Sequence, residues 1–238
     1  MKINLILMTT SEENYLKVIY HLSLVSPKGV TTNAIAGMLD TKASSVTDML
    51  KKLSDKELVA YQKYQGVTLT SKGFHLAKMI VRKHRLWEVF LVDKLNFSWD
   101  EVHDIAEELE HIKSDSLINK LDKFLGFPDF DPHGDPIPNA DGEIKKVNKL
   151  LLSEVELNKQ YRCIGMKDSS SDFLKYLDKQ KIALGSTFLV KEKESFDDTL
   201  LVEINSKEIT ISNGGSMSAS GAKKPFLLAR SSLYFLIL

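Results

Sequence analysis

The chain has 238 residues and a hydrophobic content of 43%, so it is long enough to bury a core and to form two or three small domains. Its single cysteine, Cys163, excludes a disulfide framework and favours a reducing compartment. No apolar run reaches the length of a membrane span, and residues 1–8 lack the length and the cleavage site of a signal peptide. We therefore expect a cytoplasmic protein with no membrane partner.

The 32 basic and 32 acidic side chains balance over the whole chain, but they are distributed unevenly. Residues 1–75 contain nine Lys and six acidic residues, whereas residues 99–115 contain seven acidic residues and one Lys. A mildly basic segment followed by an acidic one is typical of a nucleic-acid-binding module joined to a cation-binding module.

Three helices are predicted in the first part of the chain. Residues 9–13 (TTSEE) indicate a helix start, because hydroxyl residues cap a helix and acidic residues complement its dipole. Apolar residues at helical spacing continue this helix to a turn at 26–29. Two shorter helices are predicted at 31–39 and 44–53, joined by a turn. The apolar face of the third helix comprises Val46, Met49, Leu50 and Leu53.

Two short helices about a tight turn, followed by β-like runs at 58–64 and 67–70, predict a winged helix-turn-helix. A small helical bundle with a hairpin and no ligand is the alternative. Short polar side chains at the start of the third helix suit base edges, and lysines farther along suit phosphates. The candidate DNA-binding residues are Thr32, Lys42, Ala43, Ser44, Ser45, Thr47, Asp48, Lys51, Lys52, Lys63 and Tyr64.

A long helix is predicted from Phe74 to about Leu95, followed by a helix that contains His103 and by another that starts near Ser114. Side chains three and four residues apart share a helix face, so the His103 helix predicts one stripe of possible ligands and the long helix another. Imidazoles and carboxylates together suit a divalent cation. The alternative is an acidic amphipathic helix with solvated charges. The two stripes are His103, Glu107, Glu110 and His111, and His84 with Glu88.

Residues 127–138 form a proline-stiffened loop whose acidic residues are spaced partly as in a calcium loop. Calcium is excluded because Ala140 stands at the twelfth position, where Glu is required, and His133 at the fifth. Residues 139–149 indicate a linker. Strands predicted at 161–166, 187–190, 200–204 and 208–211 favour a small barrel of the SH3 type. The apolar end of the tail at 216–238 has no physical explanation at this stage.

Several short motifs together are specific. They are Thr-Thr-x-x-x-x-Tyr-Leu from Thr9, Ser-Ser-Val-Thr from Ser44, Leu-Thr-x-x-Gly from Leu69, Arg-Lys-His-Arg-Leu-x-Glu from Arg82, Val-His-Asp and Glu-His between Val102 and His111, and Gly-Asp-Pro-Ile-Pro from Gly134. On these motifs the chain resembles the metal-dependent repressors of the diphtheria-toxin-repressor and manganese-transport-regulator family, from residue 9 to about 212.

The resemblance implies a mainly α fold with small β parts. It implies a winged helix-turn-helix DNA-binding domain at 1–75, a helical metal-binding and dimerisation domain at 76–142, a linker at 143–153 and an SH3-like (FeoA-like) domain at 154–215. Residues 216–238 would form a tail. The implied protein is a homodimeric, metal-activated repressor that binds double-stranded operator DNA and controls metal-ion uptake and homeostasis.

The resemblance also implies up to two metal sites per subunit. One would use His84, Glu88 and His103, and the regulatory one would use Glu107, Glu110 and His111, completed by Asn14. Iron-type members have Cys where Glu107 stands, so the hard carboxylate favours Mn²⁺, with Fe²⁺ as the alternative. Manganese-type members usually have Asp at the position of Asn14 and can have Glu at that of Lys17. In the third domain, Ser169 and Asp172 fall near positions where some members donate ligands.

Two other classes of function fit the sequence less well. A His/Glu metallohydrolase is disfavoured, because the chain lacks an evident nucleophile or an open-site pattern such as His-Glu-x-x-His. A helical-bundle metal-buffer protein would leave the helix at 44–53 and its wing unexplained. We therefore expect a DNA-binding repressor rather than an enzyme.

Overall fold

In the computed structural model, the described residues are 8–62, 66–98, 101–145, 150–151, 154–166, 182, 186–196, 199–204, 207–211 and 233–237. Their contacts divide the chain into two units. The first unit comprises Met1–Trp87, Ala106–Gly126 and Ile137–Ile144. The second unit comprises Glu88–Ile105, Phe127–Pro136 and Lys145–Leu238.

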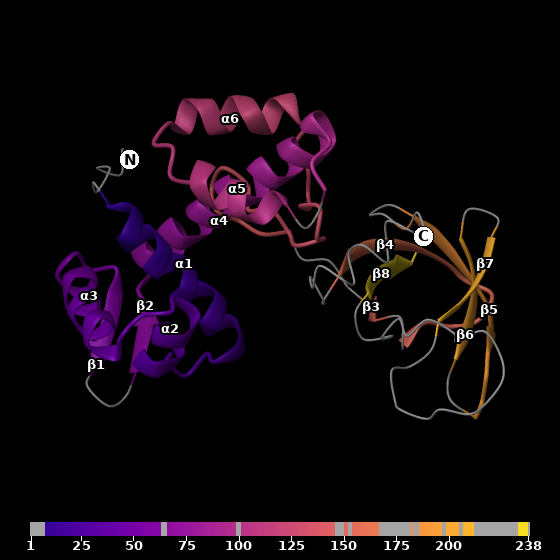
Figure 1. The fold of residues 1–238 in the computed structure, drawn as a ribbon, viewed down its shortest axis with the longest axis horizontal. Coiled ribbons are helices and arrows are strands. Elements are labelled where there is room, and N and C mark those ends of the chain that lie inside the picture. Colours follow the sequence, from indigo (N-terminus) through magenta and orange to yellow (C-terminus); the bar gives the residue numbers. More distant parts are fainter. Residues whose placement is uncertain are drawn as a thin grey trace. The chain divides into compact units, whose positions relative to one another are not determined.

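The first unit begins with the predicted three helices and hairpin (Figure 1). Thr9 caps the first helix in a capping box: its hydroxyl accepts from the Glu12 amide, and its own amide donates to the Glu12 carboxylate at 2.9 Å. Thr31 caps the second helix. These elements are α1 (Thr10–Val25), α2 (Thr32–Met38), α3 (Ala43–Asp55), β1 (Val59–Gln62) and β2 (Gly66–Leu69).

The apolar faces of these helices meet in one core with the antiparallel hairpin β1–β2. Of the predicted buried face of α3, Val46, Leu50 and Leu53 are fully buried, whereas Met49 is only partly buried at the edge of the core. A bridge between Val30 and Val67 connects the segment before α2 to the hairpin. The predicted winged helix-turn-helix is confirmed.

Gly73 allows the next helix to start against the hairpin. The Thr70 hydroxyl accepts a hydrogen bond from the Gly73 amide at 3.0 Å, which caps the long helix. A Cβ at position 73 would lie 1.9 Å from the carbonyl oxygen of Leu58, the residue just before β1. The Leu-Thr-x-x-Gly motif therefore combines a helix cap with a close backbone approach that only glycine permits.

Three further helices follow: α4 (Ser71–Leu95), α5 (Val102–Leu109) and α6 (Asp115–Phe124). Arg82 of α4, 1% exposed, donates to Asp122 of α6 at 2.7 Å and so joins these two helices by a buried ion pair. The prediction that His103, Glu107, Glu110 and His111 share one face of a single helix is wrong in one respect. The helix ends at Leu109, so Glu110 and His111 lie in the turn that follows.

In the second unit, antiparallel strands form a six-stranded sheet in the order β3-β8-β4-β5-β6-β7. Along β6, Leu200, Val202 and Ile204 are buried, and they pack with Cys163 and Phe188 in the core of the sheet. The strands are β3 (Leu150–Leu151), β4 (Gln160–Met166), β5 (Thr187–Lys193), β6 (Leu200–Ile204), β7 (Lys207–Ile211) and β8 (Leu233–Ile237). The predicted fold class, with a small SH3-like β domain at the end, is confirmed.

Two strands lie where none was predicted. Leu150–Leu151, within the predicted linker, forms β3, and Leu233–Ile237, within the unexplained tail, forms β8 between β3 and β4. A short continuous apolar run is consistent with a strand, and the apolar end of the tail pairs with two strands of this sheet. None of the helices in the described part of the chain has the length and apolarity that crossing a membrane requires.

We predict that Gly73→Ala destabilises the first unit by about 3 kcal/mol, because the new methyl group overlaps a backbone carbonyl that cannot move away freely. Gly37→Ala is the matched control. It lies within α2, and its Cβ would meet no atom within 4 Å, so it should change stability by less than about 1 kcal/mol, in the stabilising direction. Urea denaturation of both variants measures the difference. Equal stabilities would contradict the packing assigned to Gly73.

Candidate metal centre and nucleic-acid interface

The first unit contains a cluster of potential ligands formed by Glu107, Glu110 and His84, whose ligand atoms all lie within 4.8 Å of one another. Glu110 is fully buried, and one of its carboxylate oxygens lies 2.7 Å from Nδ1 of His84. Glu107 is partly exposed. The structure thus joins His84 to the predicted regulatory ligands rather than only to the predicted second site.

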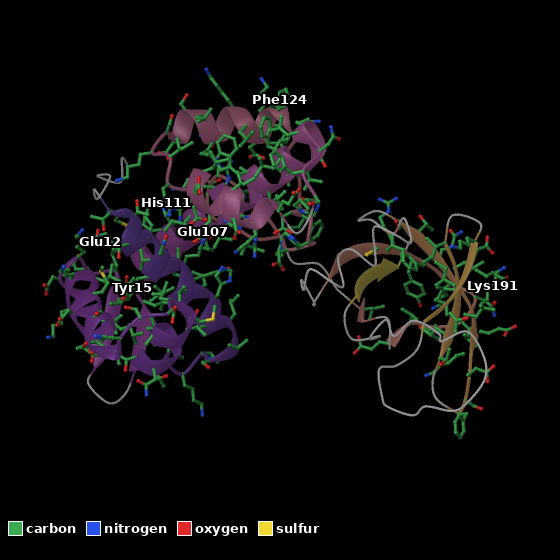
Figure 2. All side chains as sticks on the ribbon, viewed as in Figure 1. Glu12, Tyr15, Glu107, His111, Phe124 and Lys191 are labelled. Atoms are coloured by element: carbon green, nitrogen blue, oxygen red, sulfur yellow. The ribbon has the colours of Figure 1, made fainter. Side chains whose placement is uncertain are left out.

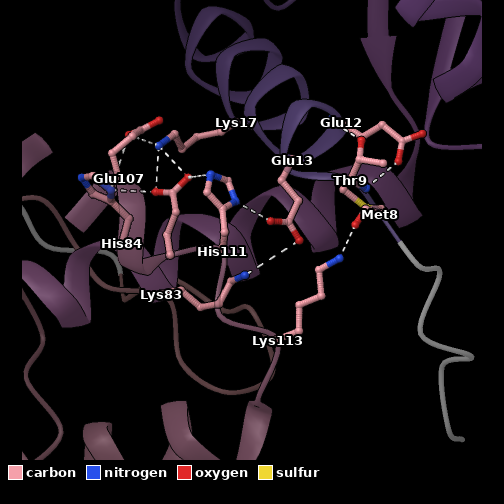
Figure 3. A network of polar contacts seen from close by, with 11 residues as sticks. Met8, Thr9, Glu12, Glu13, Lys17, Lys83, His84, Glu107, His111 and Lys113 are labelled. Carbon is pink, nitrogen blue, oxygen red and sulfur yellow. Dashed lines mark hydrogen bonds and ion pairs between the residues drawn. The ribbon is translucent and has the colours of Figure 1, made fainter. Parts of the chain in front are cut away.

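Lys17 of α1 lies within this cluster, which we call the Lys17 cluster. Its ammonium nitrogen is 2.5 Å from Oε2 of Glu107 and 2.8 Å from each carboxylate oxygen of Glu110 (Figure 3). Lys17 is only 8% exposed. A cation supplied by the chain itself therefore contacts the oxygens that a metal ion would need.

A second group of contacts extends the Lys17 cluster along α1 (Figure 3). Nδ1 of His111 lies 2.6 Å from Glu13, and its Nε2 lies 3.9 Å from Glu110. Lys83 lies 4.0 Å from Glu13. In Figure 2, Glu107 and His111 lie beside α1. Glu13 was not predicted as part of the site, because an acidic residue in the first turn of a helix was already explained by the helix dipole.

Asn14, predicted to complete the regulatory site, lies on α1 next to Glu13. Its side-chain oxygen is buried and has no hydrogen-bond partner among the described residues. Such an oxygen is a potential neutral ligand, although it adds no negative charge to the cluster.

The electrostatics of the Lys17 cluster are dominated by burial and by its internal ion pairs. Burial raises the pKa of Glu110, but the hydrogen bond from His84 and the charge of Lys17 outweigh burial and hold the pKa below its usual range. Burial lowers the pKa of Lys83, and the neighbouring Glu13 and Glu110 offset part of that effect. The charged form of Glu110 is thus stabilised without any added ion.

The second unit contains another cluster, which we call the Asp131 cluster. It comprises Glu88, Asp131 and His133, whose ligand atoms also lie within 4.8 Å of one another. Glu88 is 2% exposed and Asp131 is 3% exposed. Nδ1 of His133 lies 3.6 Å from Glu88, and Nδ1 of the exposed His103 lies 3.5 Å from it. Glu88 therefore lies beside His103, as predicted, and two further potential ligands, Asp131 and His133, lie near them.

The loop geometry that presents Asp131 is built from backbone hydrogen bonds. Oδ1 of Asp131 accepts from the amides of His133 and Asp135, each at 2.9 Å, and Gly134 provides the positive φ that the turn requires. Asp131 and His133 were not predicted as ligands, because the sequence of this loop was compared only with that of a calcium loop. The sequence feature that could have identified them as ligands is the Asp-x-His spacing in a proline-stiffened loop.

The two clusters differ in how well they suit a divalent cation. Two buried carboxylates and an imidazole lie close together in the Asp131 cluster, and such a set of hard oxygen and nitrogen donors fits Mn²⁺, Fe²⁺ or Zn²⁺. In the Lys17 cluster the ammonium already contacts both carboxylates, whose oxygens a divalent ion would need as ligands.

The remaining predicted ligands are placed only in part. His84 lies one helical turn before Glu88 on α4, so the two share a helix face, and their predicted site with His103 stays a prediction. Ser169 and Asp172 lie outside the described residues, as do Lys63 and Tyr64 of the predicted wing.

The predicted DNA-binding residues on and before α3 form an exposed surface. Thr47 donates to the carbonyl of Ala43 at 3.0 Å, and Lys51 pairs with Asp48 at 3.2 Å. Thr32, at the start of α2, and Thr47 are half-buried. The exposed members of this surface are Lys42, Ala43, Ser44, Ser45, Asp48, Lys51 and Lys52.

We predict that Glu110→Gln destabilises the metal-free protein by about 3 kcal/mol at pH 7, because the change leaves Lys17 and His84 with less compensating charge. The lowered pKa of Glu110 means that its carboxylate stabilises the fold above pH 4.5 and that this contribution is lost as the pH falls through the folded-state value. Denaturation in chelator at pH 7 and pH 4 should show a smaller difference from wild type at pH 4. A difference independent of pH would contradict this prediction.

Comparisons with known families agree with this geometry. Residues 7–67 match the family described as iron dependent repressor, N-terminal DNA binding domain. Residues 70–139 match iron dependent repressor, metal binding and dimerisation domain, and residues 150–217 match the FeoA domain.

Individual proteins are similar over different lengths. The HTH-type transcriptional regulator MntR of Oceanobacillus iheyensis is 35% identical over 144 residues, which are 60% of this chain and 90% of that protein. A probable metal transport system membrane protein of Chlamydia trachomatis is 46% identical over 86 residues, which are 36% of this chain but only 19% of that protein.

A solved structure of a manganese-dependent transcriptional repressor in complex with manganese is 34% identical, with a TM-score of 0.73. The similarity covers 95% of this chain and 100% of that one. The chain belongs to the diphtheria-toxin-repressor and manganese-transport-regulator family of metal-dependent, DNA-binding transcriptional repressors, which are not enzymes.

Proposed function

We propose that this chain is a cytoplasmic, homodimeric repressor that binds operator DNA when Mn²⁺ occupies the Asp131 cluster, and that it controls metal-ion uptake. The observation that carries the proposal is the pair of buried carboxylates, Glu88 and Asp131, held beside His133 in a chain that also exposes a hydroxyl-rich α3. Buried like charges this close favour a divalent cation as their compensation.

The donor atoms support Mn²⁺ over Fe²⁺, which is the alternative effector. Mn²⁺ prefers hard oxygen and nitrogen donors, and a thiolate would favour softer ions. The chain's single cysteine, Cys163, is buried in the core of the sheet, and the donors of the Asp131 cluster are two carboxylates and an imidazole. Relatives include a repressor solved with manganese and another, ScaR, solved with Zn²⁺.

When bound, the metal would supply positive charge that fixes Glu88, Asp131 and His133 in one arrangement. Asp131 is already preorganised by two backbone amides, so its carboxylate needs little rearrangement to act as a ligand. His103 is exposed and lies near Glu88, so it is positioned to join the same set. If Mn²⁺ bound the DNA-binding conformation more tightly than the inactive one, metal binding would raise the affinity for the operator.

DNA recognition is assigned to α3. Ser44 and Ser45 occupy its exposed first turn, where short side chains can reach base edges in the major groove, and the lysines at its end can contact phosphates. A homodimer would place two copies of α3 one helical turn of DNA apart.

The exposed apolar side chains of α6 support self-association. Leu117 is 40% exposed and Phe124 is 65% exposed on this helix, within the region that matches the dimerisation family. We assign the domains to residues 1–75, 76–142 and 154–215, with a connection at 143–153 and a tail at 216–238 that contribute strands β3 and β8 to the sheet of the third domain.

We predict that Asp131→Asn raises the Mn²⁺ concentration for half-maximal operator binding at least about tenfold. The amide oxygen can still accept from the two backbone amides, so the variant removes the charge and keeps the loop. Asp129→Asn, at an exposed residue of the same loop that pairs with Lys145, is the matched control. Gel shifts with an operator selected from random duplexes provide the measurement.

If Asp131→Asn left the Mn²⁺ concentration for half-maximal operator binding unchanged, the effector metal would not bind in this cluster. Wild-type operator binding that stayed constant between chelator and saturating Mn²⁺ would contradict the metal-activated function itself.

We also predict that Ser44→Ala lowers the ratio of operator affinity to random-DNA affinity, because it removes a base-edge hydrogen bond of about 1–3 kcal/mol. Lys51→Ala should weaken both affinities equally and reduce the salt slope by about 0.9 for each phosphate that is no longer neutralised. Binding measured at several salt concentrations separates the two effects. If Ser44→Ala leaves the affinity ratio intact, α3 does not read the bases through this residue.

A further inference from the structure

We propose that Lys17 is an internal cation that takes the place of a divalent ion in the Lys17 cluster, so that the cluster joins α1 to α5 without metal. This inference rests on the proposed function and deepens it: metal sensing would then belong to the Asp131 cluster rather than to the Lys17 cluster.

The first support is the position of the ammonium. Nζ of Lys17 contacts three carboxylate oxygens, one from Glu107 and two from Glu110, at 2.5–2.8 Å. The same two carboxylates, together with His84, make the cluster a potential metal site. A divalent ion bound to carboxylate oxygens at about 2.0–2.2 Å would lie almost in contact with the ammonium. The two cations cannot share the cluster.

The second support is the burial of Lys17. The residue is 8% exposed, and its principal partner, Glu110, is fully buried. An ammonium taken out of water in this way requires close carboxylates, and its departure would leave Glu110 buried with less compensation. The ion pair is therefore a built part of the interior rather than a surface contact.

The third support is the charge of the cluster as a whole. Its carboxylates are Glu13, Glu107 and Glu110, and its ammonium groups are Lys17 and Lys83. Three negative and two positive charges leave a net charge of −1 before the histidines are counted. A divalent ion added to this set would bring the net charge to +1 and would therefore exceed the charge that remains to be compensated.

The consequence lies in how α1 is fixed. Lys17 contacts the α5 region through Glu107 and Glu110, and Glu13 contacts His111 in the turn after α5. Lys113 also donates to the carbonyl of Met8, just before α1. These contacts use only groups of the chain, so α1 is held in place in the absence of metal.

The test measures Mn²⁺ binding to the metal-stripped full chain by electron paramagnetic resonance of free Mn²⁺. Lys17→Gln should bind one more Mn²⁺ per subunit than wild type, with Asn14 as the remaining ligand from α1. Adding Glu110→Gln to Lys17→Gln should abolish the gain, whereas Glu110→Gln alone should leave wild-type stoichiometry unchanged. Lys17→Arg, which keeps the charge, should gain nothing.

Lys56→Gln is the matched control, because Lys56 also pairs with α1, through Glu12 at 2.6 Å, but lies outside the cluster. It should not change the stoichiometry. Hydrogen exchange of α1 gives a second readout. Without metal, exchange should be at least about tenfold faster in Lys17→Gln than in wild type, and Mn²⁺ should slow it in the variant only.

The proposal would be overturned if Glu110→Gln alone lowered the number of Mn²⁺ ions bound per subunit, or if Lys17→Gln bound no more Mn²⁺ than wild type. Both readouts are independent of DNA. Failure of the proposed function would instead appear as operator binding that ignores Mn²⁺, whatever the result at Lys17.

Discussion

The contact between the Lys17 ammonium and the carboxylates of Glu107 and Glu110 is the interaction on which the first unit depends. It connects α1, which precedes the DNA-binding helices, to the region that carries the potential metal ligands. Glu110 is fully buried, and a buried carboxylate needs a cation or several donors close by. The same requirement explains why His84 and His111 also lie near it.

The two clusters meet this requirement in different ways. In the Lys17 cluster, ammonium groups from α1 and α4 compensate the carboxylates within the chain. In the Asp131 cluster, backbone amides of a stiff loop hold Asp131 near Glu88, and the nearby side chains include imidazoles. Amides and imidazoles orient carboxylates and can thereby position them as ligands of a metal ion.

Local signals made most of the fold predictable. Thr9, Thr31, Thr70 and Ser114 each cap the helix predicted after them, and apolar periodicity placed α1 to α4 and the strands β4 to β7 closely. The strands β3 and β8 were missed because their pairing is non-local. A two-residue or five-residue apolar run becomes a strand only when a partner distant in the sequence is available.

The site was predictable in its ligand types but only in part in its grouping: Glu88 lies beside His103 as predicted, whereas His84 joins Glu107 and Glu110. Glu107, Glu110 and His84 share one cluster only because α4 and α5 pack together, and helical spacing within each helix does not contain that information. Asp131 and His133 were missed because a loop ligand has no periodicity to reveal it. Glu13 was missed because its position in the first turn of α1 had a sufficient local explanation.

Position 17 shows how one side chain can change the chemistry of a whole site. With Asp at position 14 and Glu at position 17, as the resemblance gives for manganese-type members, the cluster would hold five carboxylates and the single ammonium of Lys83, a net charge of −4. Such a set cannot be buried without added cations. With Asn14 and Lys17 the same positions give three carboxylates and two ammonium groups, a net charge of −1. The electrostatic need for a metal is therefore largely removed from this cluster.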